Sequence, residues 1–91
     1  MIFPFSRYKI VGHSMSPTLK PGQTVWVFQW AYLFSKPQAG EVVVFEKEGK
    51  EMVKRITEVR DNAITVVGDN KVDSLEVGSV PVRNIVGRVL G

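Results

Sequence analysis

The stretch GHSMSPTL, residues 12–19, organises the fold of this 91-residue chain. Its first residue is a glycine, which permits backbone angles that other residues avoid. Pro17 and the KPG triplet at residues 20–22 are typical of turns. An apolar run at Tyr8–Val11 precedes the stretch, and a β-branched and aromatic run, Thr24–Phe28, follows it. The pattern therefore predicts a long polar turn between two short strands.

Similar runs continue along the chain, and turn-forming residues separate them. The predicted strands and extended segments are Tyr8–Val11, Thr24–Phe28, Glu41–Phe45, Glu51–Val59, Ala63–Val67, Val80–Val82 and Ile85–Leu90. A loop is predicted at residues 35–40, and turns at Glu46–Lys50 and at residues 61–62. Because no convincing helical period and no repeat appear, we expect a single all-β domain over residues 1–91, with a long, irregular architecture.

The composition excludes several classes of protein. The chain has 12 Lys and Arg against 9 Asp and Glu, scattered rather than clustered, so nucleic-acid binding is not indicated. A weak attraction to anionic lipid is equally compatible with this charge. With no cysteine and one histidine, neither a thiolate site nor a histidine-rich zinc site is expected, and we expect no metal or cofactor.

Membrane contact is left open by the hydropathy pattern. No run approaches the roughly 18 apolar residues of a membrane span, and the apolar start, Met1–Phe5, is too short for a secretory signal. Three alternatives remain: the chain acts in the cytoplasm, it rests on a membrane without crossing it, or a membrane anchor has been removed from it. The aromatic-rich stretch Trp26–Phe34 forms either core with one hydrophobic edge or an exposed patch that touches a bilayer interface or a partner.

Ser14 is the candidate nucleophile, and a serine hydroxyl needs a base. The single histidine, His13, is its immediate neighbour in sequence. Because neighbouring side chains of an extended segment point to opposite faces, His13 is badly placed to take the Ser14 proton.

Lys54 is the candidate base, in the run MVKRI at residues 52–56. A lysine amine with its ordinary pKa of about 10.4 is protonated at neutral pH, but burial among apolar side chains lowers that pKa. A Ser–Lys dyad is a known variant of the catalytic triad. The alternative interpretation places Lys54 on the solvent face of an alternating strand, and spacing alone does not exclude it.

Taken together, four ordered segments resemble the type I signal peptidase family of Ser–Lys endopeptidases. These segments are Gly12–Leu19, Trp30–Phe45 with its Pro37 and Gly40, Val53–Ile56, and Gly68–Asn70 followed by Ser74, Val80-Pro81 and Val86–Arg88. Each segment taken singly is an ordinary turn or strand. Their order is what makes the resemblance specific, and it covers roughly Tyr8–Val89.

The resemblance implies a coiled β-sheet fold shared with SOS-response repressors, and it implies roles for individual residues. Ser14 is the nucleophile, with its backbone N–H as an oxyanion donor, Lys54 is the general base, and Ser74 orients the lysine amine. Asp69 and Arg55 form a supporting ion pair. Apolar pockets for small substrate side chains, typically Ala, are lined by Ile10, Met15, Leu19, Met52 and Val53.

The chain also departs from the family pattern. Many members have a Ser where this chain has Gly12, so a second oxyanion hydroxyl is missing. The family's Asp-Ser-Arg after the orienting serine is replaced by Glu76-Val77-Gly78, in which Glu76 can still be the acid but its Arg partner is missing. The family's large insertion and N-terminal anchor have no counterpart here, so the resemblance implies a near-minimal member.

Several functions remain open at this point. The first is a membrane-associated endopeptidase that cuts a leader or pro-segment after a small residue through an acyl-enzyme. The second is a soluble, cytoplasmic maturation protease for one precursor, of the kind that processes nickel superoxide dismutase. A self-cleaving domain of the SOS-repressor kind is disfavoured, because Ala39-Gly40 follows Ser14 in the chain. The last is a β binding module that has lost catalysis.

Overall fold

The computed structural model describes residues 4–70 and 78–90 of the chain. Its elements in chain order are β1 (Phe5–Lys9), β2 (Thr24–Phe28), α1 (Ala31–Phe34), β3 (Val42–Lys47), β4 (Lys50–Arg60), β5 (Ala63–Val67), β6 (Gly78–Pro81), the 3-10 helix η1 (Val82–Asn84) and β7 (Ile85–Leu90). The described chain is therefore almost entirely strand and turn, which confirms the predicted all-β class.

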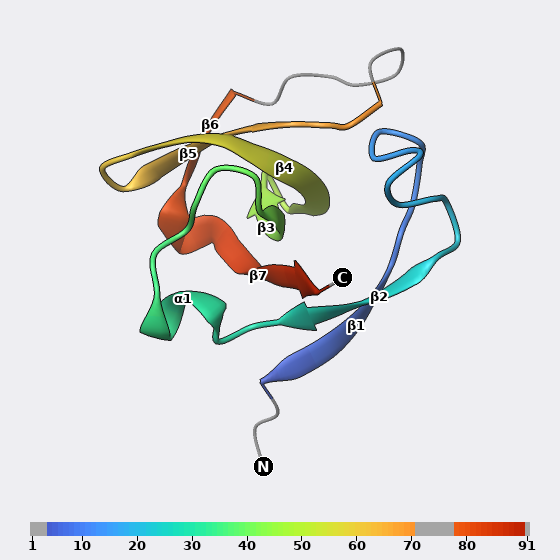
Figure 1. Ribbon diagram of the computed structural model, residues 1–91, viewed down its shortest axis with the longest axis horizontal. Coiled ribbons are helices and arrows are strands. Elements are labelled where there is room, and N and C mark those ends of the chain that lie inside the picture. The colour runs from blue at the N-terminus through green and yellow to red at the C-terminus, as the bar shows by residue number, and fades with distance from the viewer. Residues whose placement is uncertain (1–3, 71–77, 91) are drawn as a thin grey trace.

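All seven described strands belong to one antiparallel sheet in the order β1-β2-β7-β3-β4-β5-β6. The last strand, β7, lies between β2 and β3 and pairs with both of them. Figure 1 shows that the sheet curls, so that the β1–β2 pair and the β4–β5 pair lie on opposite sides of β7. This curl brings the turn after β1 close to the start of β4 and the end of β5.

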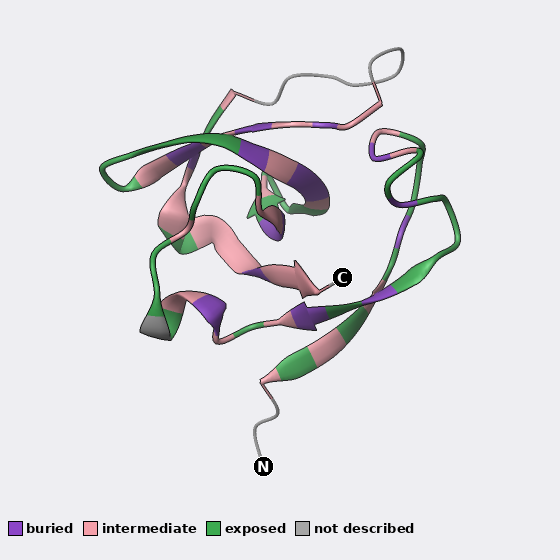
Figure 2. Cartoon of the chain, viewed as in Figure 1, coloured by how far each residue is buried: buried purple, intermediate pink, exposed green. Residues whose placement is uncertain are grey.

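The curled sheet has a hydrophobic cluster on each face, and β3 contributes to both. Val44 packs with the cluster that contains Val25 and Val53, whereas Val43 and Phe45 belong to the opposite cluster. The buried residues appear as purple bands along the strands in Figure 2. Each fully buried side chain of this size contributes roughly 1.5–3 kcal/mol. The continuous apolar run of β3 is thus explained by burial on both faces.

The hairpin between β3 and β4 is tighter than the sequence indicated. Glu48 and Gly49 both have positive φ, 54° and 79°, which is the requirement of a two-residue turn that matches the strand twist. The predicted turn at Glu46–Lys50 is therefore correct in place but too long, because β3 extends to Lys47 and β4 begins at Lys50.

Other elements also differ from the prediction, and β1 and the two short helices differ most. β1 spans Phe5–Lys9 rather than Tyr8–Val11, because Gly12 turns the chain and Val11 is already 84% exposed. The helices α1 and η1 were not predicted, since three or four residues are too few to display a helical period. Val82 accordingly lies in η1 and not in an extended segment.

Candidate active site

Ser14 lies in the turn of residues 12–19, which is anchored in the core. Met15 and Leu19 are 2% and 6% exposed, and the Leu19 N–H donates to the Met15 carbonyl at 2.8 Å. Gly12 has φ of +83°, in the left-handed region that favours glycine. The two anchors and the glycine bend hold Ser14 half-buried at the surface of the turn.

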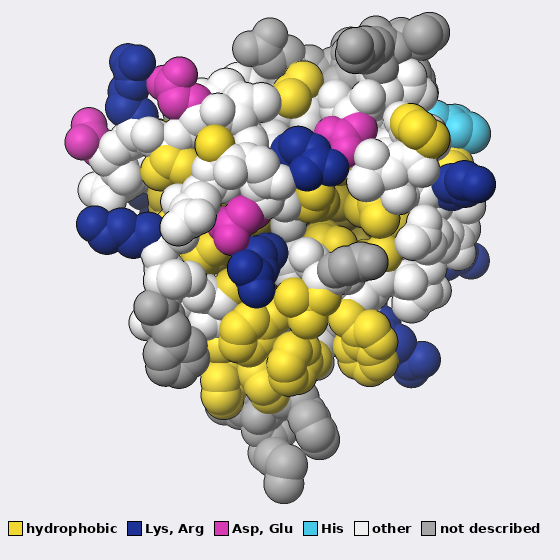
Figure 3. Space-filling view, in the orientation of Figure 1, with side chains coloured by type: hydrophobic (Ala, Val, Ile, Leu, Met, Phe, Trp, Pro, Cys, Tyr) yellow, Lys and Arg dark blue, Asp and Glu magenta, His cyan; other side chains and the backbone are white. Residues whose placement is uncertain are grey.

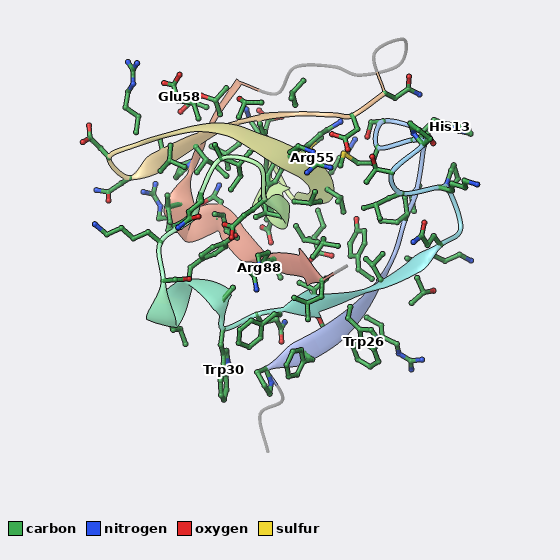
Figure 4. The ribbon with its side chains drawn as sticks, viewed as in Figure 1. His13, Trp26, Trp30, Arg55, Glu58 and Arg88 are labelled. Atoms are coloured by element: carbon green, nitrogen blue, oxygen red, sulfur yellow. The ribbon has the colours of Figure 1, made fainter. Side chains whose placement is uncertain are left out.

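His13 is exposed and lies at the outer rim of the turn (Figure 4). Its main chain is nevertheless engaged, since its carbonyl accepts a hydrogen bond from the Ser16 N–H at 3.0 Å. The imidazole therefore lies on the surface, while the peptide that joins His13 to Ser14 takes part in the hydrogen bonds of the turn.

Lys54 is a buried residue of β4 that pairs with Val43 of β3, and it is 7% exposed. Its neighbour Val53 and the following Ile56 are also buried. The interpretation that Lys54 lies on the solvent face is therefore wrong. Alternation fails as a guide here because this half of β4 is covered on both faces.

Ser14 and Lys54 line the same cavity, which has a volume of about 240 Å³. One wall comes from β1 and the turn that follows it, and the other wall comes from the first half of β4. Four of the five residues predicted to contact substrate side chains lie in its lining, namely Ile10, Met15, Met52 and Val53. The lining also contains Tyr8, Val11 and Glu51, which the sequence did not single out.

Leu19 does not line this cavity. It lies in the wall of a neighbouring one, of about 400 Å³, together with Arg55 and Arg88. Leu19 is buried in the core cluster that contains Met15, so it anchors the turn. This placement does not support its predicted contact with substrate.

The cavity lies between two strand edges. β1 is an edge strand of the sheet in the described chain. β5 pairs with β4 from Arg55 to Arg60, so within the described residues the edge of β4 before Arg55 is open on that side. The Tyr8 hydroxyl donates to the Glu51 carbonyl at 3.3 Å and so spans the two walls. An extended peptide can add to such an open edge through main-chain hydrogen bonds.

Arg55 and Asp69 form a two-pronged ion pair next to the turn. Arg55 Nε donates to Asp69 Oδ1 at 2.8 Å and Nη2 donates to Oδ2 at 2.6 Å, while Nη1 donates to the Gly40 carbonyl at 2.7 Å. The hydrogen bonds from Arg55 lower the pKa of Asp69, burial opposes this shift, and the Thr18 side chain adds a further hydrogen bond. The pair therefore joins β4 to the loop before β3, and Thr18 connects it to the turn of residues 12–19.

Asn70 makes two further hydrogen bonds to the turn of residues 12–19. Its backbone N–H donates to the Ser14 carbonyl at 2.8 Å, and its side-chain Nδ2 donates to the His13 carbonyl at 2.9 Å. The sequence marked Gly68–Asn70 only as a segment, and gave Asn70 no role. The available signal was weak, because an asparagine after Gly-Asp is common in turns.

Two predicted site residues, Ser74 and Glu76, lie outside the described residues. Among the residues that are described, no three His, Asp or Glu side chains are grouped so as to hold a metal ion. In the same part of the chain, no helix has the length and hydropathy needed to cross a membrane.

The aromatic stretch Trp26–Phe34 contains both buried and exposed side chains. Trp26 and Leu33 are 54% and 72% exposed, although Val27 and Ala31 between them are buried. Apolar side chains gather over β1, β2 and the region near α1 in Figure 3. The stretch therefore contributes partly to the core and partly to the exposed surface, and contact of its exposed part with a bilayer or a partner stays a prediction.

The fold and the cavity together define a small all-β protein in which a serine and a buried lysine line one cavity. Residues 1–59 match the family model described as signal peptidase, peptidase S26. The chain therefore belongs to this family of peptidases, and the matched region includes both Ser14 and Lys54. Comparison with curated proteins gives no significant match.

Proposed function

We propose that this protein is a serine endopeptidase that cuts a leader peptide or pro-segment after a small residue, with Ser14 as nucleophile and Lys54 as general base. The observation that carries the proposal is the shared cavity, whose lining includes Ser14, Lys54 and several apolar residues. Burial favours the neutral amine of a lysine, which is the form that can accept a proton.

The proposed reaction proceeds in two stages. Neutral Lys54 Nζ takes the proton of the Ser14 hydroxyl as Oγ attacks the substrate carbonyl, and the Ser14 N–H donates to the oxyanion. The tetrahedral intermediate collapses as the Lys54 ammonium returns the proton to the leaving amine, which leaves an acyl-enzyme. Water then attacks the ester, Lys54 takes the water proton, and the proton passes to Ser14 Oγ as the acid product leaves. Ser74 is proposed to orient the Lys54 amine.

The proposed substrate binds as an extended strand between the edges of β1 and β4. Side chains of alternate substrate residues then point into the cavity, whose apolar lining includes Ile10, Met15 and Val53. A cavity of about 240 Å³ shared with the catalytic groups favours small residues such as Ala at the first and third positions before the cut.

The exposed aromatic patch supports a further part of the proposal, contact with a membrane surface. Trp26 is half-exposed, and the Arg7 guanidinium lies over its ring at 5.9 Å from the centroid. Phe5 stacks on Phe28 beside it, with ring centroids 5.0 Å apart. Aromatic rings next to cationic side chains suit the interface of an anionic bilayer.

The test is cleavage of a leader peptide with Ala at the first and third positions before the cut. Wild type is compared with Lys54→Ala and with Lys50→Ala, a matched control because Lys50 is an exposed lysine of the same strand. We expect cleavage by wild type and Lys50→Ala, and none by Lys54→Ala. Equal cleavage by all three proteins contradicts the dyad.

Anionic phospholipid vesicles added to the same assay distinguish two versions of the proposal. Faster cleavage with vesicles supports a protease that acts at a membrane surface. Indifference to vesicles favours the second candidate, a soluble maturation protease, because the patch then has no role in catalysis. Failure of wild type to cut any peptide of a varied panel contradicts both versions and supports a binding module.

A further inference from the structure

We propose that Asn70 is a positioning residue that orients the oxyanion donor of Ser14, an inference that rests on the proposed function. Asn70 donates two hydrogen bonds to successive carbonyls of the turn of residues 12–19, called here the nucleophile turn: from Nδ2 to His13 at 2.9 Å and from its N–H to Ser14 at 2.8 Å. The first of these contacts joins residues 57 positions apart in the chain, so the two bonds fix Asn70 against a distant turn.

The geometry of the peptide bond connects Asn70 to the Ser14 N–H. The carbonyl of His13 and the N–H of Ser14 belong to one planar trans peptide, in which the two groups point in opposite directions. Fixing the carbonyl oxygen therefore fixes the direction of the N–H. The His13 oxygen is held by two donors, Asn70 Nδ2 and the Ser16 N–H, the latter at 3.0 Å.

The same hydrogen bonds also strengthen the donor. A carbonyl that accepts hydrogen bonds polarises its peptide unit and makes the N–H at the other end a better donor. The oxyanion donor must be oriented before charge develops, because the rate gain of such a site comes from preorganisation. Asn70 thus orients the Ser14 N–H in advance without contacting the reacting atoms.

Asn70 is itself held in place by its neighbour in sequence. Asp69 is fixed by both prongs of Arg55 and by the Thr18 side chain. Thr18 belongs to the nucleophile turn, so Asp69 and Asn70 bind this turn near its two ends. The main-chain bond from Asn70 to Ser14 completes the connection and does not depend on the Asn70 side chain.

The experiment removes only the side-chain donor. Asn70→Asp keeps the shape of the side chain and the main-chain bond but has no N–H₂ to donate, and Asn70→Ala removes the donor without adding charge. The matched control is Asn84→Asp, because Asn84 Nδ2 donates to the Glu46 carbonyl at 3.0 Å, the same kind of bond far from the cavity. Steady-state kinetics on the leader peptide give kcat and KM separately.

We expect both Asn70 variants to lower kcat about 10- to 100-fold, somewhat less than complete loss of an oxyanion donor, and to leave KM within about twofold. A peptide aldehyde, whose adduct with Ser14 carries an oxyanion, should lose affinity by a similar factor. Asn84→Asp should change neither quantity. An unchanged kcat, or a KM that rises in step with the loss of kcat, overturns the inference.

A second measurement keeps this inference separate from the proposed function. If wild type cuts no peptide, the proposed function fails, but the orientation of the Ser14 peptide can still be examined by the ¹H–¹⁵N resonance of Ser14. Asn70→Ala must shift that resonance, and Asn84→Asp must leave it in place. A Ser14 resonance that does not move in Asn70→Ala overturns the structural part of the inference.

Discussion

The two halves of β4 both carry charged residues but differ in their surroundings. The half next to the turn of residues 12–19, namely residues 52–56, includes Lys54 and Arg55, whereas the half next to the following hairpin, residues 57–60, is exposed throughout. Figure 4 places Arg55 at the first end and Glu58 at the other. A break in the pairing register with β5 between Ile56 and Glu58 separates the two halves.

Each half of β4 contributes to one ion pair, and the exposed fractions of the paired side chains measure how differently the two halves are surrounded. Arg55 and Asp69 have side chains 32% and 15% exposed and are joined by two hydrogen bonds. Arg60 and Glu58 form a pair at 3.0 Å, but their side chains are 82% and 54% exposed. Coulombic attraction is screened in the second pair and much less in the first. Whether an ion pair of β4 contributes to stability thus depends on the segments that pack onto the strand, rather than on the residue types of the strand itself.

The largest expected effect concerns Lys54, the most deeply buried ionisable side chain in the first half of β4. Lys54→Arg should abolish cleavage, with a loss of roughly 10⁴-fold or more in kcat, because a guanidinium does not deprotonate and cannot act as a base. Ser14→Ala should lose as much. Peptide cleavage measures both, and circular dichroism checks that the variants are folded. Activity retained in Lys54→Arg would remove the lysine from the mechanism.

The second effect concerns stability. Arg55→Ala should lower the free energy of unfolding by about 2 kcal/mol, because it leaves the mostly buried Asp69 carboxylate without its partner. Urea unfolding at pH 7 measures the loss. The double variant Arg55→Ala/Asp69→Asn should recover part of it, since the unpaired charge is then gone. No recovery would mean that the loss arises from something other than the unpaired charge.

How far the sequence predicts these differences can be judged from particular elements. The bounds of β2, β5 and β7 agree with the prediction, because β-branched runs flanked by turn residues determine strands locally. The all-β class and the family follow from such local patterns and ordered motifs. The burial of Lys54 does not, since it depends on the turn and the loop that pack against β4 after folding. The role proposed for Asn70 could not be predicted either, because it depends on hydrogen bonds between segments distant in sequence.

A third, smaller effect depends on pH. The folded-state pKa of Asp69 is lowered from its ordinary value of 3.8, chiefly by the hydrogen bonds from Arg55. The ionised carboxylate is therefore favoured by folding, so this contribution to stability is complete well above pH 3.8 and is lost as the pH falls toward the folded-state pKa. Urea midpoints measured at pH 6 and pH 3 should differ less in Asp69→Asn than in wild type. An equal difference in both proteins would contradict the assignment.

The smallest expected effect is at the other end of the strand. Arg60→Ala removes an ion pair whose side chains are mostly in water, and it should change the free energy of unfolding by less than about 0.5 kcal/mol. Glu58→Gln should behave alike, and neither variant should alter kcat or KM, because the pair is remote from the cavity. The measurement is the same urea series used for Arg55→Ala, repeated at low and high salt. If Arg60→Ala cost as much as Arg55→Ala, packing against the turn and the loop could not be what distinguishes the two halves of β4.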